Sequence, residues 1–143
     1  MSAPGYRGYI FSRPTCGGRA PQHIQNLVIR DYAAKNGMLY KLSATEYAMP
    51  DSYLILHQVL EGLGGLQGII LYSIFLLPSD HAERRKIYRR VIEAGCGLHA
   101  AVEGMALEDW EDAERWEVVL LTAEICNKVN YHKIEQWLTQ WLT

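Results

Sequence analysis

The chain has 143 residues, the length of one ordinary domain with a single hydrophobic core. A hydrophobic fraction of 49% and a charged fraction of 21% exclude a disordered chain. The net charge of −2 argues against a protein that lives on nucleic acid, because such proteins carry a basic excess. Three widely spaced cysteines indicate neither a disulfide framework nor a zinc site. We expect no metal, and the cofactor stays unknown.

The first residues lack the basic start and the apolar run of a signal peptide. The longest apolar stretch, Ile69 to Leu77, is too short to cross a bilayer. We therefore expect a cytoplasmic protein with no membrane partner. One basic cluster stands out, and on a helix such a run is typical of a solvated face. It contains Arg84, Arg85, Lys86, Arg89 and Arg90.

The first half of the chain predicts two strands and two helices. A short aromatic and β-branched strand covers residues 6–11, and a loop rich in Pro and Gly follows to residue 21. Pro21 suits the first turn of a helix, which Asn36-Gly37 ends. A second strand covers residues 38–42. Asp51-Ser52 then predicts the cap of a second helix, which ends at Gly64-Gly65.

The second half continues the alternation. Residues 68–73 form an apolar run typical of a strand buried on both faces, and Ser79-Asp80 caps a helix that reaches about Glu93. A fourth strand covers residues 98–102. The pattern predicts one α/β domain over residues 1–143, with a four-stranded, mainly parallel sheet flanked by helices, then a long C-terminal helix and a short final helix.

The long helix, over residues 108–129, suggests an assembly surface. Its first half is acidic, whereas residues 116–129 are apolar on more than one face. Trp137 and Trp141 are four residues apart and so share one face of the final helix. We expect a homo-oligomer or a hetero-complex formed through the 108–129 helix.

The order of elements resembles the catalytic domain of serine recombinases, the resolvases and invertases. Residues 8–12 are similar to that family's opening Gly-Tyr-x-Arg-x-Ser strand, and residues 101–105 resemble the segment before its long dimer helix. The family's arginine falls on Phe11, however, and its serine falls on Arg13 or, after a slip, on Ser12. Its later arginines fall near Phe75, Leu76 and Ser79. Phosphate chemistry needs those cations, so we do not expect DNA strand transfer.

Three longer stretches resemble a small bacterial family encoded in sporadic gene clusters for unusual carbohydrates. They are residues 7–14, 19–32 and 42–49, which contain Ser-Arg-Pro, Pro-Gln-His-Ile-Gln-Asn and Ser-Ala-Thr-Glu-Tyr-Ala-Met. The resemblance implies a role in making a sugar or a glycan precursor. It implies no particular catalytic residues.

The candidate site lies beyond the carboxyl ends of the parallel strands, where ligands bind in open α/β sheets. The candidate acid–base residues are His23, Glu46 and Glu103. The candidate substrate-binding residues are Ser12, Arg13, Arg19, Gln22, Asn26, Ser43, Thr45, Tyr72 and Ser73. We expect the loop arginines to bind a small polar ligand or a phosphorylated sugar.

Each candidate has a structural alternative. His23 could be a surface or capping histidine, and Glu46 and Glu103 could cap helices or pair with the loop arginines. Cys16 is the one candidate for a reactive thiol. Two functions follow: an enzyme acting on a sugar or nucleotide-sugar intermediate, or a non-catalytic subunit that completes a larger biosynthetic enzyme.

Overall fold

The computed structural model describes residues 4–14, 20–128 and 131–142. Its strands are β1 (Tyr6–Ile10), β2 (Tyr40–Thr45), β3 (Gly68–Leu71), β4 (Gly97–Ala100) and β5 (Met105–Leu107). Its helices are α1 (Gln22–Lys35), α2 (Leu54–Glu61), α3 (His81–Glu93), α4 (Trp110–Lys128) and α5 (Tyr131–Leu142). Two short 3-10 turns, η1 (Leu63–Gly65) and η2 (Ile74–Leu76), flank β3.

The strands form one sheet in the order β2-β1-β3-β4-β5. The first four are parallel, and β5 runs antiparallel to β4. The predicted α/β class with a mainly parallel sheet is confirmed, and the sheet has one strand more than predicted. Gly104, with φ +64°, turns the chain back into β5. Three residues are too few to give a periodic signal, which is why the sequence did not predict this strand.

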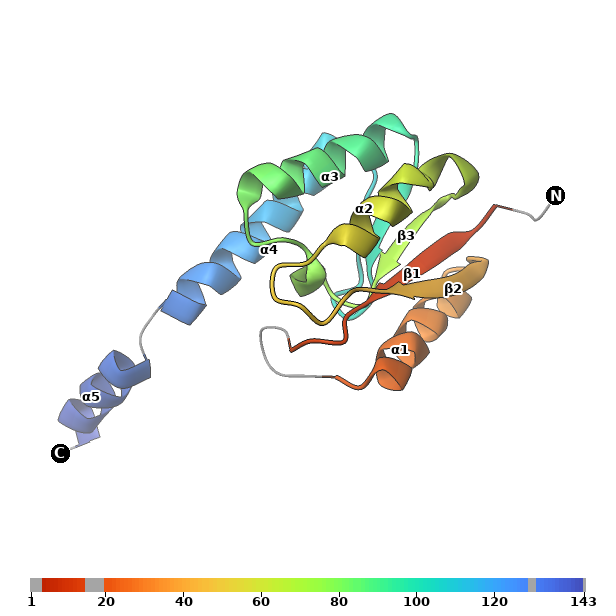
Figure 1. Cartoon of the computed structure of the whole chain (residues 1–143). Coiled ribbons are helices and arrows are strands. Elements are labelled where there is room, and N and C mark those ends of the chain that lie inside the picture. The colour runs from red at the N-terminus through yellow and green to blue at the C-terminus, as the bar shows by residue number, and fades with distance from the viewer. Residues whose placement is uncertain (1–3, 15–19, 129–130, 143) are drawn as a thin grey trace.

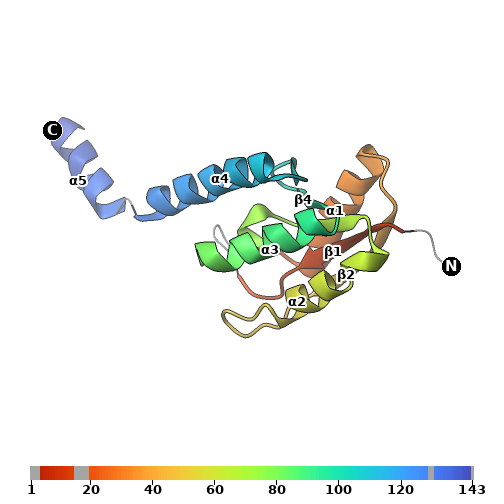
Figure 2. The same ribbon diagram turned by 90° about the horizontal axis from the view of Figure 1, so that it is seen from above.

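Helices cover the two faces of the sheet unequally (Figures 1 and 2). One face packs against α2, α3 and the first turns of α4, and its core includes Tyr9, Leu56, Ile69, Tyr88 and Trp116. The other face packs against α1 alone, and its smaller core contains Ile10, Ile29, Ala33 and Ile70. Successive residues along β1, and likewise along β3, thus point to opposite cores, as they do in a strand whose two faces are both buried.

The edge strand β2 is longer than predicted and extends to Thr45. Ser43 and Thr45 therefore lie within the strand and not in a loop after it. The predicted strand ended at Leu42, which is 79% exposed on this edge. The strand continues for three more residues, so the end of the apolar run is not the end of the strand. The pairing with β1 shifts register here, and Ser43 lies over Gly8. A Cβ at Gly8 would lie 2.1 Å from Ser43 Oγ, so only glycine fits there.

The helix α4 begins against the sheet, and its C-terminal part projects away from it (Figures 1 and 2). Ala113 and Trp116 are buried against the sheet, whereas Val118, Leu121 and Ile125 are all more than half exposed. The α5 helix lies beyond the far end of α4 (Figure 1). No helix within the described ranges is long and apolar enough to cross a membrane.

Candidate functional site

Glu46 directly follows β2 and is buried at the start of α2. Its two carboxylate oxygens accept five hydrogen bonds at 2.8–3.3 Å. The donors are the hydroxyls of Tyr9 and Ser52 and the backbone amides of Tyr47, Ile55 and Leu56. The two helix amides would otherwise lack partners. Glu46 thus caps α2, which was the alternative to an acid–base role. Its oxygens are fully occupied by these hydrogen bonds and leave no place for a substrate.

The hydrogen bonds also keep Glu46 ionised. Burial by itself raises the pKa of a carboxyl group. Here the hydrogen bond from Tyr9 and those from the backbone outweigh burial, so the pKa of Glu46 lies below its ordinary value. The predicted cap at Asp51-Ser52 is wrong. Ser52 instead donates to Glu46, and Asp51 takes a left-handed conformation with φ +59°.

Arg13, which follows β1, holds the same segment from the other side. Its Nη1 donates to the carbonyls of Tyr47, Met49 and Ser52 at 3.2, 3.1 and 2.9 Å. Its guanidinium carbon lies 4.0 Å from the ring centre of Phe11 and 5.0 Å from that of Tyr53. The side chain predicted to bind an anion is thus engaged in fastening the chain after β2.

The fastened segment forms one wall of a cleft of about 770 Å³. The first wall is residues 49–54, with His57 of α2 beside it, and the second wall is residues 78–80 with Glu83 of α3. Both walls follow strands that end at the same edge of the sheet, where an open α/β fold binds ligands. Most of the exposed lining area is apolar, and the polar side chains that line it are Asp51, Ser52, Tyr53, His57, Ser79, Asp80 and Glu83.

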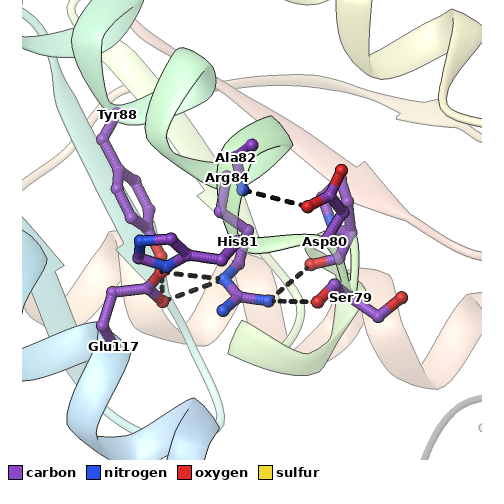
Figure 3. A network of polar contacts seen from close by, with 8 residues as sticks. Ser79, Asp80, His81, Ala82, Arg84, Tyr88 and Glu117 are labelled. Carbon is purple, nitrogen blue, oxygen red and sulfur yellow. Dashed lines mark hydrogen bonds and ion pairs between the residues drawn. The ribbon is translucent and has the colours of Figure 1, made fainter.

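Arg84 holds the second wall (Figure 3). Its Nη1 donates to the carbonyls of Pro78 and Ser79 at 3.1 and 2.8 Å, and its Nε donates to Glu117 of α4 at 2.9 Å. Arg84 is only 8% exposed. Because a buried guanidinium needs a counter-charge, Glu117 balances it, so α4 contributes directly to the position of the cleft wall.

Two further side chains complete this cluster (Figure 3). Tyr88 Oη donates to Glu117 Oε2 at 3.1 Å, and His81 Nδ1 lies 2.5 Å from Glu117 Oε1. Burial, followed by the charge of Glu117, raises the pKa of Tyr88, which therefore stays a neutral donor. Asp80 caps α3 as predicted and accepts from the amide of Ala82 at 3.0 Å.

Two further predicted site residues, Ser73 and Glu103, meet after β3 and β4, so Glu103 does not pair with Glu46. Ser73 Oγ donates to Glu103 Oε2 at 2.9 Å, and the amide of Ile74 donates to Oε1 at 2.6 Å. Glu103 thus caps the turn η2, again the structural alternative. Tyr72 precedes this pair and packs against both cores.

The candidates on α1 lie elsewhere. Asn26 Oδ1 accepts from Tyr40 Oη at 3.5 Å, and Tyr40 Oη lies 2.7 Å from Ser43 Oγ. Gln22 and His23 are exposed on the first turn of the helix. Gln25, a residue not predicted for the site, is buried and bonds both the amide and the carbonyl of Phe11.

The structure therefore divides the predicted site into separate sets. Ser12 joins Glu46 through a 3.2 Å hydrogen bond to its carbonyl, close to where Arg13 is engaged. Ser73 and Glu103 form a second set, and Asn26 with Ser43 a third. In the described part of the chain, no hydrogen bond links one set to another. Arg19 and Cys16 lie outside the described residues.

None of the described residues that line the cleft was predicted as a site residue. Asp80 was interpreted only as a helix cap, and His57 was not among the predicted site residues. Asp80 is the N-cap of α3 and His57 lies on α2, and both come later in the chain than the polar residues that directly follow the strands. In the described ranges, no three His, Cys, Asp or Glu side chains are arranged as metal ligands.

The buried His99 should make the stability of the protein depend on pH. His99 in β4 lies between the rings of Tyr6 and Tyr32, its Nδ1 2.8 Å from Tyr32 Oη, and burial lowers its pKa. The unfolded chain therefore takes up a proton below about pH 6.5 that the native protein resists. We expect the free energy of unfolding to decrease as the pH falls below that value, by about 1.4 kcal/mol per unit of pKa difference.

Urea unfolding between pH 7.5 and 5 measures this effect. The His99→Gln variant should lose the pH-dependent part, whereas His57→Gln, an exposed histidine, should keep it. An unchanged pH slope in His99→Gln would contradict the assignment.

No model of a known protein family matches the sequence, and no curated protein sequence matches it. Two solved structures share its fold. A resolvase family site-specific recombinase from Streptococcus pneumoniae matches with a TM-score of 0.58 and 12% identity, over 96% of this chain and 99% of that chain. The N-terminal catalytic domain of TP901-1 integrase matches with a TM-score of 0.54 and 12% identity, over 87% and 99%. At such identity the likeness establishes the resolvase-like fold alone.

Proposed function

We propose that this protein binds an uncharged, hydroxyl-rich small molecule, a sugar or the sugar part of a biosynthetic intermediate, in the cleft between residues 49–54 and 78–83. The observation that carries the proposal is the cleft itself. Its volume of about 770 Å³ is that of a small-molecule site. Its carboxylates accept hydrogen bonds from hydroxyl groups, and Tyr53 and His57 add planar rings for an apolar face of a sugar.

The charge of the lining narrows the ligand class. Among the described residues that line the cleft, three are acidic, Asp51, Asp80 and Glu83, and none is Lys or Arg; Lys86 pairs with Glu83 at 3.1 Å from outside the lining. A phosphate group would meet repulsion here, since nearby like charges disfavour one another. The expected phosphorylated ligand is therefore less well supported than a neutral sugar. Arg13 is engaged with backbone carbonyls and points to no anion.

The walls are preorganised for binding. Arg13 and Glu46 tie down one wall, and Arg84 ties down the other through hydrogen bonds to backbone carbonyls. Groups held in place before a ligand arrives lose less conformational entropy when it binds. The resemblance to the carbohydrate gene-cluster family agrees with a sugar ligand.

Replacing His57 or Asp80, two side chains that line the cleft, should weaken sugar binding. Ligand-observed NMR with glucose, glucosamine and glucose 6-phosphate measures this directly. We expect His57→Ala and Asp80→Asn to raise the dissociation constant for glucose by about tenfold each, the worth of about 1.4 kcal/mol. Asparagine still caps a helix, so Asp80→Asn keeps α3 intact.

The matched control is Glu93→Gln, an exposed carboxylate at the other end of α3. It should bind glucose as the unchanged protein does. Preferential binding of glucose 6-phosphate, or equal weakening by all three variants, would contradict the proposed ligand class.

A second function, that of an assembly subunit, is favoured by the exposed face of α4. Val118, Leu121 and Ile125 are 63%, 55% and 54% exposed and follow the i, i+3, i+7 spacing of one helix face. On α5, Trp137 and Trp141 are exposed, with ring centres 5.7 Å apart. Apolar area of this kind marks a surface that another protein covers. We propose that the protein works as a homo-oligomer or within a hetero-complex formed through α4.

Leu121→Glu should therefore separate the subunits. Sedimentation equilibrium of the purified chain should show an oligomer that becomes a monomer in the variant, with its circular dichroism unchanged. Glu124→Gln, an exposed position about 120° around the helix from Val118, should leave the oligomer intact. A chain that is monomeric at all concentrations would instead require a different protein partner. Co-purification of the tagged protein from its own cells should then yield a stoichiometric complex, and Leu121→Glu should disrupt it.

A further inference from the structure

A second, smaller pocket lies between α3 and α4. It has a volume of about 240 Å³ and shares none of its described lining residues with the cleft. Pockets for drug-sized ligands measure about 300–1,000 Å³, so this one has the size for a smaller molecule. It is called here the helix pocket, and its lining residues are His81, Arg85, Tyr88, Trp110, Ala113, Glu114 and Glu117.

The periodicity of the two helices brings these residues together. On α3 the lining residues follow the i, i+4, i+7 spacing of one helix face, and on α4 they follow i, i+3, i+4, i+7. Tyr88 and Ala113 are buried and form the floor of the pocket. Because Ala113 ends at its Cβ, the space above the floor stays open.

One of the charges in the lining is already balanced. Glu117 accepts hydrogen bonds from Arg84 and Tyr88, and His81 lies against it (Figure 3). The charges that remain are Arg85 on α3 and Glu114 on α4. Among the residues that the structure describes, neither of these two forms a hydrogen bond or an ion pair, with each other or with any other residue.

An aromatic ring positions the unpaired cation. The guanidinium carbon of Arg85 lies 5.5 Å from the ring centre of Trp110. The guanidinium keeps its N–H donors in this contact, and two of them match the two oxygens of a carboxylate group. The carboxylate of Glu114, on the other helix, accepts hydrogen bonds and suits an ammonium group.

The two unpaired charges decide the class of ligand. A simple anion would be attracted by Arg85 and repelled by Glu114, and a simple cation would meet the reverse. A small molecule that carries both charges is attracted by both side chains. We propose that the helix pocket binds a free α-amino acid, with its carboxylate on Arg85 and its ammonium group on Glu114. The rings of Trp110 and Tyr88 then offer apolar surface to its side chain.

Three related compounds test this proposal on the full chain. L-leucine carries both charges, N-acetyl-L-leucine lacks the ammonium group, and L-leucinamide lacks the carboxylate. Ligand-observed NMR at constant ionic strength should show that L-leucine binds about tenfold more tightly than either analogue. Arg85→Gln should weaken L-leucine about tenfold and abolish its advantage over L-leucinamide. Glu114→Gln should weaken it similarly and abolish its advantage over N-acetyl-L-leucine.

The matched controls are Arg89→Gln on α3 and Glu111→Gln on α4, two exposed residues outside the pocket. Both variants should bind L-leucine as the unchanged protein does. The proposal is overturned if L-leucine shows no saturable binding, if the three compounds bind equally, or if the controls weaken binding as much as Arg85→Gln. It does not rest on the sugar cleft, so a failure of glucose to bind would leave this result untouched.

Discussion

Replacing Glu46 by alanine is expected to lower the free energy of unfolding by about 3–5 kcal/mol. The side chain is 1% exposed and accepts five hydrogen bonds. Its removal leaves Tyr9 Oη and the first amides of α2 buried without a partner. Because Glu46 also holds Tyr47 and Ser52, the first wall of the cleft should loosen as well.

The same carboxylate makes stability depend on acid. The folded-state pKa of Glu46 lies below its ordinary value, so its stabilisation is complete above the unfolded-state value of about 4.3. It is lost as the pH falls through the folded-state pKa. Urea unfolding at pH 7 and pH 3.5 should show this loss in the unchanged protein and a smaller one in Glu46→Gln.

Glu114→Gln serves as the control for both measurements, since Glu114 is exposed near the start of α4. It should change stability by less than about 0.5 kcal/mol. If Glu46→Ala were equally mild, the five hydrogen bonds would not be the cap that the geometry indicates.

Replacing Arg84 by methionine is expected to cost about 3–5 kcal/mol, because it leaves Glu117 as a partly buried charge with its main counter-charge removed. The Nε–Oε2 distance is 2.9 Å, and the two side chains are 10% and 19% exposed. The carbonyls of Pro78 and Ser79 lose their donor in the same variant. We therefore expect weaker glucose binding together with lower stability.

A double-mutant cycle separates the pair from its surroundings. Arg84→Met combined with Glu117→Gln should cost less than the sum of the two single changes, with a coupling energy of about 1–3 kcal/mol in urea unfolding. Arg89→Met, an exposed arginine on the same helix, should be nearly neutral. Additive effects of the two changes would show that the ion pair does not hold α4 against the wall.

The architecture could be predicted because it depends on local patterns. Apolar runs such as residues 68–71 and capping residues such as Asp80 act over a few positions, and alternation of strand and helix leaves few topologies. β5 escaped prediction because three residues carry no period. The apolar second half of α4 was also predicted, whereas which of its apolar residues stay exposed was not.

The site could be predicted only in part. Parallel strands do bring polar residues to one edge, and Ser12, Arg13, Glu46, Ser73 and Glu103 lie there as expected. Nothing in the sequence says that Glu46 and Glu103 have their oxygens filled by helix amides, or that Arg13 faces carbonyls. Those outcomes depend on which backbone groups the folded chain leaves without partners.

The sequence by itself determined the class of this protein: an α/β fold of resolvase-like layout, with a long helix near its C-terminal end whose second half is apolar. Periodicity and residue type suffice for such conclusions, because both act along the chain. Only the tertiary structure decided which polar residues remain open to a ligand. Hydrogen-bond partners come from distant segments, as when Glu117 of α4 reaches Arg84 beside the cleft, and that pairing has no signal in local sequence.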